Sequence, residues 1–327
     1  MTAPLLAVDA PSLYFRAYFG VPESSARTAT GQPVNAIRGF LDMIATLVRT
    51  RKPDRIVCAL DADWRPAWRV ELLPSYKAHR VVAEPAASTG PAPGASLRSA
   101  GEPAPGVSVE EVPDTLAPQV PMLLEVLDAF GIAHFGVPGY EADDVLGTLA
   151  ARATIDEPVE VVSGDRDLFQ LVDDVRGVRL LYIGRGVAKL EDCDEAAVLA
   201  KYGVPASAYA DFAALRGDPS DGLPGVPGVG EKTACALVNR FGNLAGIRAA
   251  AAEPVAEMAT GLRRKILDAS AYLDVAPKVV RVVEDVPLPH LEYALPKAPQ
   301  DADRVLELAE EWNLAGSCRR LVDALAL

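Results

Sequence analysis

Apolar residues in the first half of the chain fall into short runs that end in acidic residues. Runs of four or five mostly apolar residues, bounded by turn formers, are typical of strands buried in a parallel sheet. The pattern therefore predicts an α/β fold with a mostly parallel sheet. Three runs are followed closely by aspartates: Leu5–Val8 by Asp9, Ile56–Leu60 by Asp61, and Val159–Val162 by Asp165 and Asp167.

Helical spacing separates these runs. Between Asn35 and Arg51 the apolar residues recur every three or four positions, which predicts an amphipathic helix. A second helix is expected at Pro121–Phe130, followed by a strand near residues 133–137. From about residue 180 the pattern turns helical, so we expect two domains, residues 1–180 and 181–327.

A low-complexity segment interrupts the first domain at residues 83–108. It is rich in proline, alanine and glycine, lacks aromatic residues and contains few large aliphatic ones. Such a segment buries too little apolar surface to offset the entropy lost on ordering. We expect residues 83–108 to be disordered or poorly packed.

The acidic residues are expected to converge. In open parallel sheets, sites form beyond the carboxyl ends of the strands. A single aspartate at a strand end is usually a turn former or a helix cap, but repetition at three strand ends weakens that explanation. Converging carboxylates repel one another unless cations neutralise them, and oxygen ligands suit Mg²⁺ or Mn²⁺. The nine acids are the four strand-end aspartates, Glu141, Asp143 and Asp144 at a helix start, and Asp218 and Asp221 in a glycine-rich loop.

Composition narrows the functional classes. The net charge of −13 argues against a simple cationic nucleic-acid binder. The four cysteines are widely separated, which predicts reduced thiols and, with only three histidines, no zinc site. The start of the chain lacks a basic region of the kind that opens a signal peptide, and no apolar stretch reaches the roughly 18 residues that span a bilayer. We therefore expect a cytoplasmic enzyme with no membrane partner.

The loop between Gly217 and Ala234 has two glycine-rich interpretations. A P-loop requires lysine directly after its second glycine, but Glu231 occupies that position and would repel a triphosphate. A helix-hairpin-helix type loop instead uses glycines for close backbone approach and helix-start amides to hold a phosphate without reading base sequence. We favour this second interpretation, with Lys232 adding positive charge.

Taken together, these motifs resemble the bacterial 5′-3′ exonuclease and flap endonuclease family, known also as the N-terminal nuclease domain of DNA polymerase I. The likeness covers nearly the whole chain outside residues 83–108. It implies a PIN-like twisted sheet, a C-terminal helix-three-turn-helix region and two-metal hydrolysis of DNA. The segments that carry it are Leu73–Arg80, Gly139–Leu146, Ser163–Leu171 and Gly217–Ala234.

The same resemblance implies roles for individual residues. The first metal would be held by Asp9, Asp61, Glu141 and Asp143, and the second by Asp165, Asp167 and Asp221 with Asp143 between them. Asp144 and Asp218 would act through bound water, and Lys77 and Arg80, sharing a helix face, would steer the scissile phosphate. DNA would be contacted by Arg16, Tyr76, Gly225, Gly228, Gly230, Lys232 and Thr233, while the carbonyls of Val226 and Val229 would bind K⁺.

The chain also departs from the family pattern. Gly222 stands where relatives often place asparagine, and Arg98 is the only basic residue of the 83–108 insert in the arch region. We expect a stand-alone, monomeric nuclease acting on 5′ flaps, nicks and duplexes with 5′ single-stranded ends. Two alternatives remain: a PIN-type ribonuclease and a non-catalytic DNA-binding protein. A haloacid-dehalogenase-type phosphatase is excluded because Asp9 is followed by Ala10-Pro11 rather than by the required Asp-x-Asp.

Overall fold

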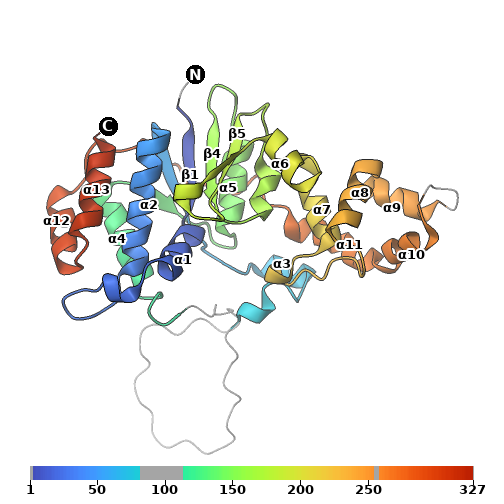
Figure 1. Cartoon of the computed structure of the whole chain (residues 1–327), viewed down its shortest axis with the longest axis horizontal. Coiled ribbons are helices and arrows are strands. Elements are labelled where there is room, and N and C mark those ends of the chain that lie inside the picture. The colour runs from blue at the N-terminus through green and yellow to red at the C-terminus, as the bar shows by residue number, and fades with distance from the viewer. Residues whose placement is uncertain (1–2, 82–112, 254–257, 327) are drawn as a thin grey trace, which may run out of the picture.

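A six-stranded sheet forms the centre of the molecule in the computed structural model, which describes residues 3–81, 113–253 and 258–326 (Figure 1). The strand order is β3-β2-β1-β4-β5-β6, with every neighbouring pair parallel except β5 and β6. The predicted mostly parallel sheet is thus confirmed, whereas the 83–108 insert lies outside the described residues. The strands are β1 Leu5–Asp9, β2 Arg55–Ala59, β3 Ala133–Phe135, β4 Val159–Ser163, β5 Val178–Tyr182 and β6 Glu191–Cys193.

Helices cover both faces of this sheet, as the pleat of a buried strand requires. Leu6 and Val8 of β1 point into a core shared with α1 (Ala10–Gly20), α2 (Asn35–Arg51) and α4 (Gln119–Phe130). Leu5 and Ala7 point to the other face, where α5 (Ala142–Ala151) packs. The helix expected at Asn35–Arg51 is confirmed with the same bounds, and the one expected at Pro121–Phe130 begins two residues earlier.

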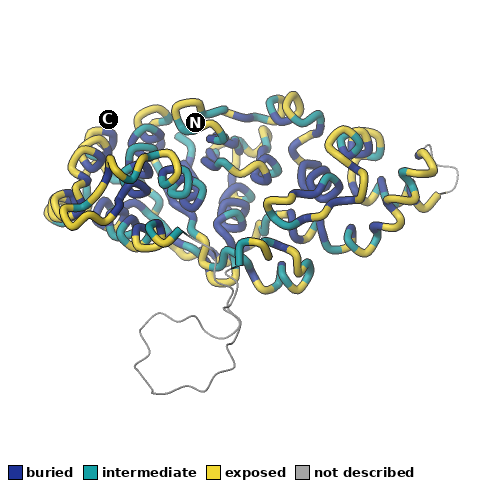
Figure 2. Tube along the Cα trace, turned by 60° about the horizontal axis from the view of Figure 1, so that its bottom comes forward, coloured by how far each residue is buried: buried dark blue, intermediate teal, exposed yellow. Residues whose placement is uncertain are grey.

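A helical region extends from one side of the sheet (Figure 1). It contains α6 (Glu195–Tyr202), α7 (Tyr209–Arg216), α8 (Glu231–Phe241), α9 (Leu244–Ala252), α10 (Thr260–Asp268) and α11 (Ser270–Val280). Buried residues concentrate in the interior of the molecule (Figure 2). In the helical region, nearly all of α7 is buried, whereas most of α10 is exposed. The short helix α3 (Ala67–Leu72), which follows β2 along the chain, lies beside α11.

The last two helices depart from the expected division at residue 180. The sheet continues to β6, and α12 (Ala302–Glu311) and α13 (Ala315–Leu325) return to pack on α4 and α2. Their apolar faces, which include Leu308 and Leu321, complete the core on that side of the sheet. Residues 181–327 are therefore not one continuous helical domain. No helix within the described ranges is long and apolar enough to cross a membrane.

The strand order places a topological switch point between β1 and β4. From β1 the chain first builds outward through β2 and β3, and β4 then pairs with the opposite edge of β1. Connections leave such neighbouring strands in opposite directions, which opens a crevice at their carboxyl ends. Asp9 ends β1 and Asp165 follows β4, so both side chains are delivered to this crevice.

Two distant loops meet beside the crevice through backbone contacts. The Lys77 amide donates to the Asp221 carbonyl at 3.0 Å, and the Ser75 hydroxyl donates to the Gly222 carbonyl at 2.8 Å. Gly222 has a φ of +71°, and a Cβ there would lie 2.0 Å from the Ser75 carbonyl oxygen. The close approach of these loops therefore requires a residue without a side chain at position 222.

Gly222→Ala should destabilise the protein by roughly 1–3 kcal/mol, because the added Cβ must push the loops apart as well as accept a positive φ. Gly31→Ala is the matched control, since Gly31 also has a positive φ, +90°, but a Cβ there meets nothing within 4 Å. Urea unfolding of both variants measures the difference. An equal loss of stability in the two variants would show that the contact with Ser75 carries no weight.

Candidate active site

The ends of β1 and β4 are joined by a chain of hydrogen bonds. Asp9 caps α1 by accepting from the Ser12 amide at 3.0 Å, and its second oxygen accepts from the Ser163 hydroxyl at 2.5 Å. The same hydroxyl accepts from the Asp165 amide at 2.9 Å. Ser163 therefore fixes Asp9 and the loop of Asp165 relative to each other.

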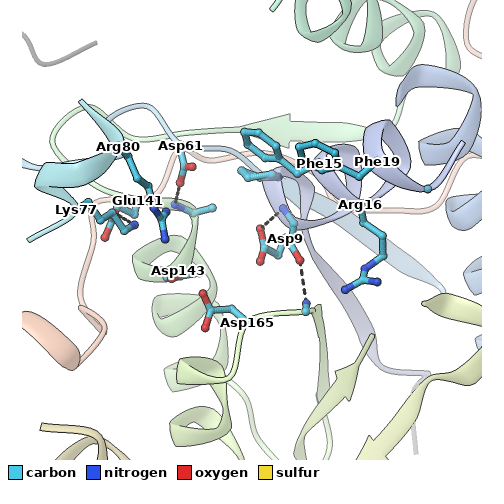
Figure 3. A pocket seen from close by; sticks show the side chains of 15 residues that line it. Asp9, Phe15, Arg16, Phe19, Asp61, Lys77, Arg80, Glu141, Asp143 and Asp165 are labelled. Carbon is cyan, nitrogen blue, oxygen red and sulfur yellow. Dashed lines mark hydrogen bonds and ion pairs between the residues drawn. The ribbon is translucent and has the colours of Figure 1, made fainter. Parts of the chain in front are cut away.

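The start of α5 contributes the third side of the site. Asp61, which follows β2, accepts a hydrogen bond from the Ala142 amide at 2.8 Å and so anchors the first turn of this helix. Asp143 points from that turn into the same space as Asp9 and Asp165, and Glu141 precedes it (Figure 3). Segments far apart in the sequence thus place their acids around one centre.

These residues line a cavity of about 630 Å³. Five of the nine predicted acids reach it: Asp9, Asp61, Glu141, Asp143 and Asp165. The predicted cations Lys77 and Arg80 lie on one side, and Arg16 with two aromatic residues of α1, Phe15 and Phe19, lies on the other (Figure 3). The cavity thus combines anionic, cationic and aromatic surfaces.

The other four acids lie around the cavity without lining it. Asp221 accepts from Arg80 at 3.0 Å, and Asp218 is held by its own loop, accepting from the Ser220 amide at 2.9 Å. Asp167 is buried, and its Oδ1 has no hydrogen-bond partner among the described residues. Asp144 is fully buried and faces Arg69 instead of the cavity.

Crowding of these carboxylates perturbs their proton affinities. Burial is the largest cause that raises the pKa of Asp9 to about 7; the charges of Asp61 and Asp165 add to the shift, while hydrogen bonds from Ser163 and Ser12 oppose it. Burial, followed by the charges of Asp165 and Asp9, raises the pKa of Asp143 well above its ordinary value. The cluster therefore carries electrostatic repulsion that a bound cation would relieve.

Glu141 is held mainly by cationic and hydroxyl groups. Its carboxylate contacts Lys77 and Arg69 and accepts from the Tyr76 hydroxyl at 2.7 Å. Burial raises the pKa of Glu141 to about 7 even though the charges of Lys77 and Arg69 lower it. Burial alone would lower the pKa of Lys77, but the charge of Glu141 raises it well above its usual value.

The donor set fits hard divalent cations. All of the converging side chains offer carboxylate oxygens, the ligands that suit Mg²⁺ or Mn²⁺, and the unpartnered Oδ1 of Asp167 is a buried acceptor in need of a cation or donor. Within the described residues, no group of three or more His, Cys, Asp or Glu side chains is placed so that it could hold a metal ion without rearrangement. Mg²⁺ usually keeps several of its waters, so carboxylates around it can bind it through water as well as directly, and an open arrangement suits it.

The segment Leu73–Arg80 differs in part from expectation. Tyr76 is only 4% exposed and packs in the core, so its ring has almost no free surface on which a base could stack. Lys77 has a φ of +47° and precedes the single turn Ala78–Arg80, so Lys77 and Arg80 do not share a regular helix face. Their side chains nevertheless reach the same cavity.

The sequence pattern did not identify three residues at or beside the cavity, which are Phe15, Phe19 and Arg69. Phe15 and Phe19 lie four residues apart on α1, a spacing that suggests a core face, yet Phe19 is 75% exposed. Arg69 is buried on α3, a helix of only six residues that is too short for its periodicity to reveal which side faces inward.

The second half of the glycine-rich loop, from Gly225 to Gly230, leads into the start of α8 (Figure 1). Gly225 and Gly228 have positive φ angles of +67° and +71°, which form a tight path into the helix at Gly230. Lys232 in the first turn is exposed, and Thr233 is half-buried. Lys265 of α10, which was not predicted, donates to the Gly228 carbonyl at 3.0 Å.

Comparisons with known proteins agree with this arrangement. Residues 4–203 match the model of the 5′-3′ exonuclease N-terminal resolvase-like domain, and residues 204–303 match that of the 5′-3′ exonuclease C-terminal SAM fold. The chain belongs to the 5′-3′ exonuclease family. It is 56% identical to a 5′-3′ exonuclease of Streptomyces coelicolor, over 98% of this chain and 99% of that protein.

Two further relatives come from Mycobacterium tuberculosis. A 5′-3′ exonuclease of Mycobacterium tuberculosis is 52% identical over 99% of this chain and 98% of its own length. DNA polymerase I of the same species is 35% identical over 98% of this chain, which spans only 32% of the polymerase. The family assignment makes the chain a nuclease, as the acid cluster predicts.

Solved structures share the fold at low sequence identity. The phage T5 D15 protein, crystallised with metal ions, matches with a TM-score of 0.60 and 16% identity, over 98% of this chain and 99% of that one. The catalytic core of Rad2 in complex with DNA substrate matches with a TM-score of 0.57 and 17% identity, over 100% of this chain and 93% of that one. These likenesses confirm the expected α/β fold with its helical C-terminal region.

Asp143→Asn should stabilise the metal-free protein at pH 8 by roughly 0.5–2 kcal/mol. The folded-state pKa of Asp143 lies above its unfolded value, so folding favours the protonated form and the free energy of unfolding falls as pH rises past that unfolded value. Asparagine does not titrate, so it removes this pH-dependent loss of stability. The difference in free energy of unfolding between variant and wild type should therefore close toward pH 4. Urea unfolding in EDTA from pH 4 to pH 8 provides the measurement. A gap that does not change with pH would contradict the assigned repulsion.

Proposed function

We propose that this nuclease is a divalent-metal-dependent 5′-3′ exonuclease and flap endonuclease that hydrolyses DNA phosphodiesters by a two-metal mechanism. The observation that carries the proposal is the single cavity lined by five carboxylates together with Lys77 and Arg80. The related fold of the phage T5 D15 flap endonuclease, seen in a product-like complex with DNA and metal ions, supports the same assignment.

We assign the acids to two metal positions. Asp9, Asp61, Glu141 and Asp143 would hold one Mg²⁺ or Mn²⁺, and Asp165, Asp167 and Asp221 would hold the second, with Asp143 between them. When bound, the metals would supply an activated water and stabilise charge on the phosphoryl and leaving oxygens. Asp218, already bonded to Ser220, would act through water.

Asp144 receives a different role from the one expected for it. Its two oxygens together accept four hydrogen bonds, from both Arg69 Nη atoms and from the amides of Glu141 and Val283. A carboxylate with this many partners has little capacity left for a metal-bound water. We propose that Asp144 anchors Arg69 and the start of α5.

The cationic side of the cavity would bind the scissile phosphate. Lys77 and Arg80 now contact Glu141 and Asp221, and the same donors would face phosphoryl oxygens when a strand occupies the cavity. Across from them, Phe15 and the exposed Phe19 offer rings on which unpaired bases would stack, while Arg16 adds charge.

The glycine-rich loop would hold the duplex away from the cleavage point. Amides near Gly228 and Gly230 and the exposed Lys232 would bind backbone phosphates, with Gly225 and Thr233 completing the loop. The carbonyls of Val226 and Val229 would bind K⁺ there. This duplex grip favours DNA over the single-stranded target of a PIN-type ribonuclease, which remains the second candidate, and the acid-lined cavity disfavours a non-catalytic DNA-binding protein.

Asp143→Ala should reduce cleavage by roughly 100-fold or more, since it removes the carboxylate placed between the two metals. The assay uses 5′-labelled flap, nicked and single-stranded DNA, and a matched RNA flap, with Mg²⁺, Mn²⁺ or EDTA. Asp323→Ala, an exposed aspartate on α13, is the control and should cleave like wild type. Near wild-type cleavage by folded Asp143→Ala would exclude the two-metal model, and preference for the RNA flap would favour the ribonuclease.

Lys232→Ala should weaken duplex binding equally for all sequences and reduce the slope of log K against log salt by about one unit. Lys297→Ala, an exposed lysine near the C-terminal helices, is the matched control. Fluorescence anisotropy with two unrelated duplexes at several salt concentrations tests both variants. A loss that depends on base sequence, or an unchanged slope, would show that Lys232 does not contact phosphate.

A further inference from the structure

Arg69 occupies an unusual position for a charged side chain. It is 2% exposed and lies on α3, between the acid cluster and the end of α11. Its guanidinium group has five N–H donors, and five acceptors surround it. They are Asp144 Oδ1 at 2.7 Å, Asp144 Oδ2 at 2.8 Å, a Glu141 oxygen, the Val279 carbonyl at 3.1 Å and the Arg281 carbonyl at 3.4 Å.

The pairing with Asp144 makes the guanidinium rigid. The two Nη atoms meet the two carboxylate oxygens in the parallel, bidentate geometry that fixes both distance and plane. Asp144 is in turn held by the amides of Glu141 and Val283 at 3.2 and 2.9 Å. Arg69 and Asp144 therefore form one fixed unit inside the protein.

Glu141 is bound to this unit on the side that faces the cavity. One of its oxygens contacts Arg69 and the Tyr76 hydroxyl, while the other contacts Lys77 at the cavity wall. Arg69 itself does not line the 630 Å³ cavity. It borders a small adjoining void of about 10 Å³ that Asp143, Asp167 and Asp221 also line. Arg69 therefore touches the proposed metal ligand from outside the larger cavity, which would receive the substrate.

We propose that Arg69 is a positioning residue that orients Glu141 for metal binding and ties that orientation to the end of α11. The proposal rests on the proposed function, because it requires Glu141 to be a metal ligand. The bonds to the carbonyls of Val279 and Arg281 connect the helical region to the acid cluster through the same guanidinium. Side chains that orient a metal ligand from behind typically contribute 10–100-fold to metal affinity.

A simpler role for Arg69 would be charge neutralisation of two buried acids. Lysine distinguishes the two roles, because it keeps the positive charge but cannot form the planar bidentate pair. Neutralisation alone predicts that Arg69→Lys binds metal like wild type, whereas positioning predicts weaker binding. Arg51→Lys is the matched control: Arg51 also binds a buried carboxylate, Glu160, and lies at the end of α2, away from the cavity.

The experiment measures Mn²⁺ affinity without DNA, by the loss of the free Mn²⁺ signal in electron paramagnetic resonance, and thermal unfolding in EDTA. We expect Arg69→Lys to fold and to bind Mn²⁺ about 10–100-fold more weakly, with Arg51→Lys unchanged. The single-turnover cleavage rate of Arg69→Lys should recover to within about threefold of wild type at saturating Mn²⁺, because Arg69 does not touch substrate.

Wild-type Mn²⁺ affinity in Arg69→Lys, or equal weakening in Arg51→Lys, would overturn the proposal, as would a rate that stays low at saturating Mn²⁺. If Arg69→Lys does not fold, Asp144→Asn breaks the same bidentate pair from the acidic side, and wild-type affinity there would also overturn it. Asp143→Ala distinguishes a failure of the Arg69 proposal from a failure of the metal site. Mn²⁺ affinity unchanged by that substitution would refute the proposed metal site itself, independently of Arg69.

Discussion

Mutual repulsion among carboxylates is the constraint around which this structure is organised. The carboxyl ends of β1 and β4, the residues after β2 and the first turn of α5 all direct acids into one cavity. Burial and like charges raise the pKa values of Asp9 and Asp143, so the metal-free site favours protons or cations. Repulsion among these carboxylates is unfavourable without a cation, and a bound divalent cation would relieve it.

Cationic side chains from neighbouring segments offset part of this repulsion. Lys77 and Arg69 contact different oxygens of the Glu141 carboxylate, and Arg80 contacts Asp221. Each comes from residues 67–80, the segment that precedes the part of the chain outside the described residues. The same short segment thus balances the charge of the acids, meets the loop at Gly222 and reaches α11, so it joins the sheet, the cavity and the helical region.

Much of the site was predictable because the strand-end rule depends only on topology. Runs of apolar residues indicate buried parallel strands. The carboxyl ends of parallel strands place Asp9, Asp61 and Asp165 at one edge of the sheet, whatever the details of packing. The direction of individual side chains was not predictable in this way. Asp143 and Asp144 are adjacent on a helix and therefore point about 100° apart, so one faces the cavity and the other faces Arg69.

Long-range packing explains the features of the structure that the sequence did not predict. The burial of Tyr76 depends on a core built from segments that are distant in sequence, and the left-handed backbone at Lys77 depends on the loop that closes at Gly222. The return of α12 and α13 to the sheet likewise follows from an apolar surface on α2 and α4 that local periodicity does not assign to a partner. The burial of Arg69 likewise depends on contacts with residues that are distant in sequence.

Anomalous diffraction from crystals soaked in Mn²⁺ would locate the metals directly. We expect two anomalous peaks in the cavity, both adjacent to Asp143, one toward Asp9 and Glu141 and the other toward Asp165 and Asp167. Well-ordered crystals that show no peak beside Asp143, or Mn²⁺ only at sites elsewhere on the molecule, would contradict a two-metal site built on these acids.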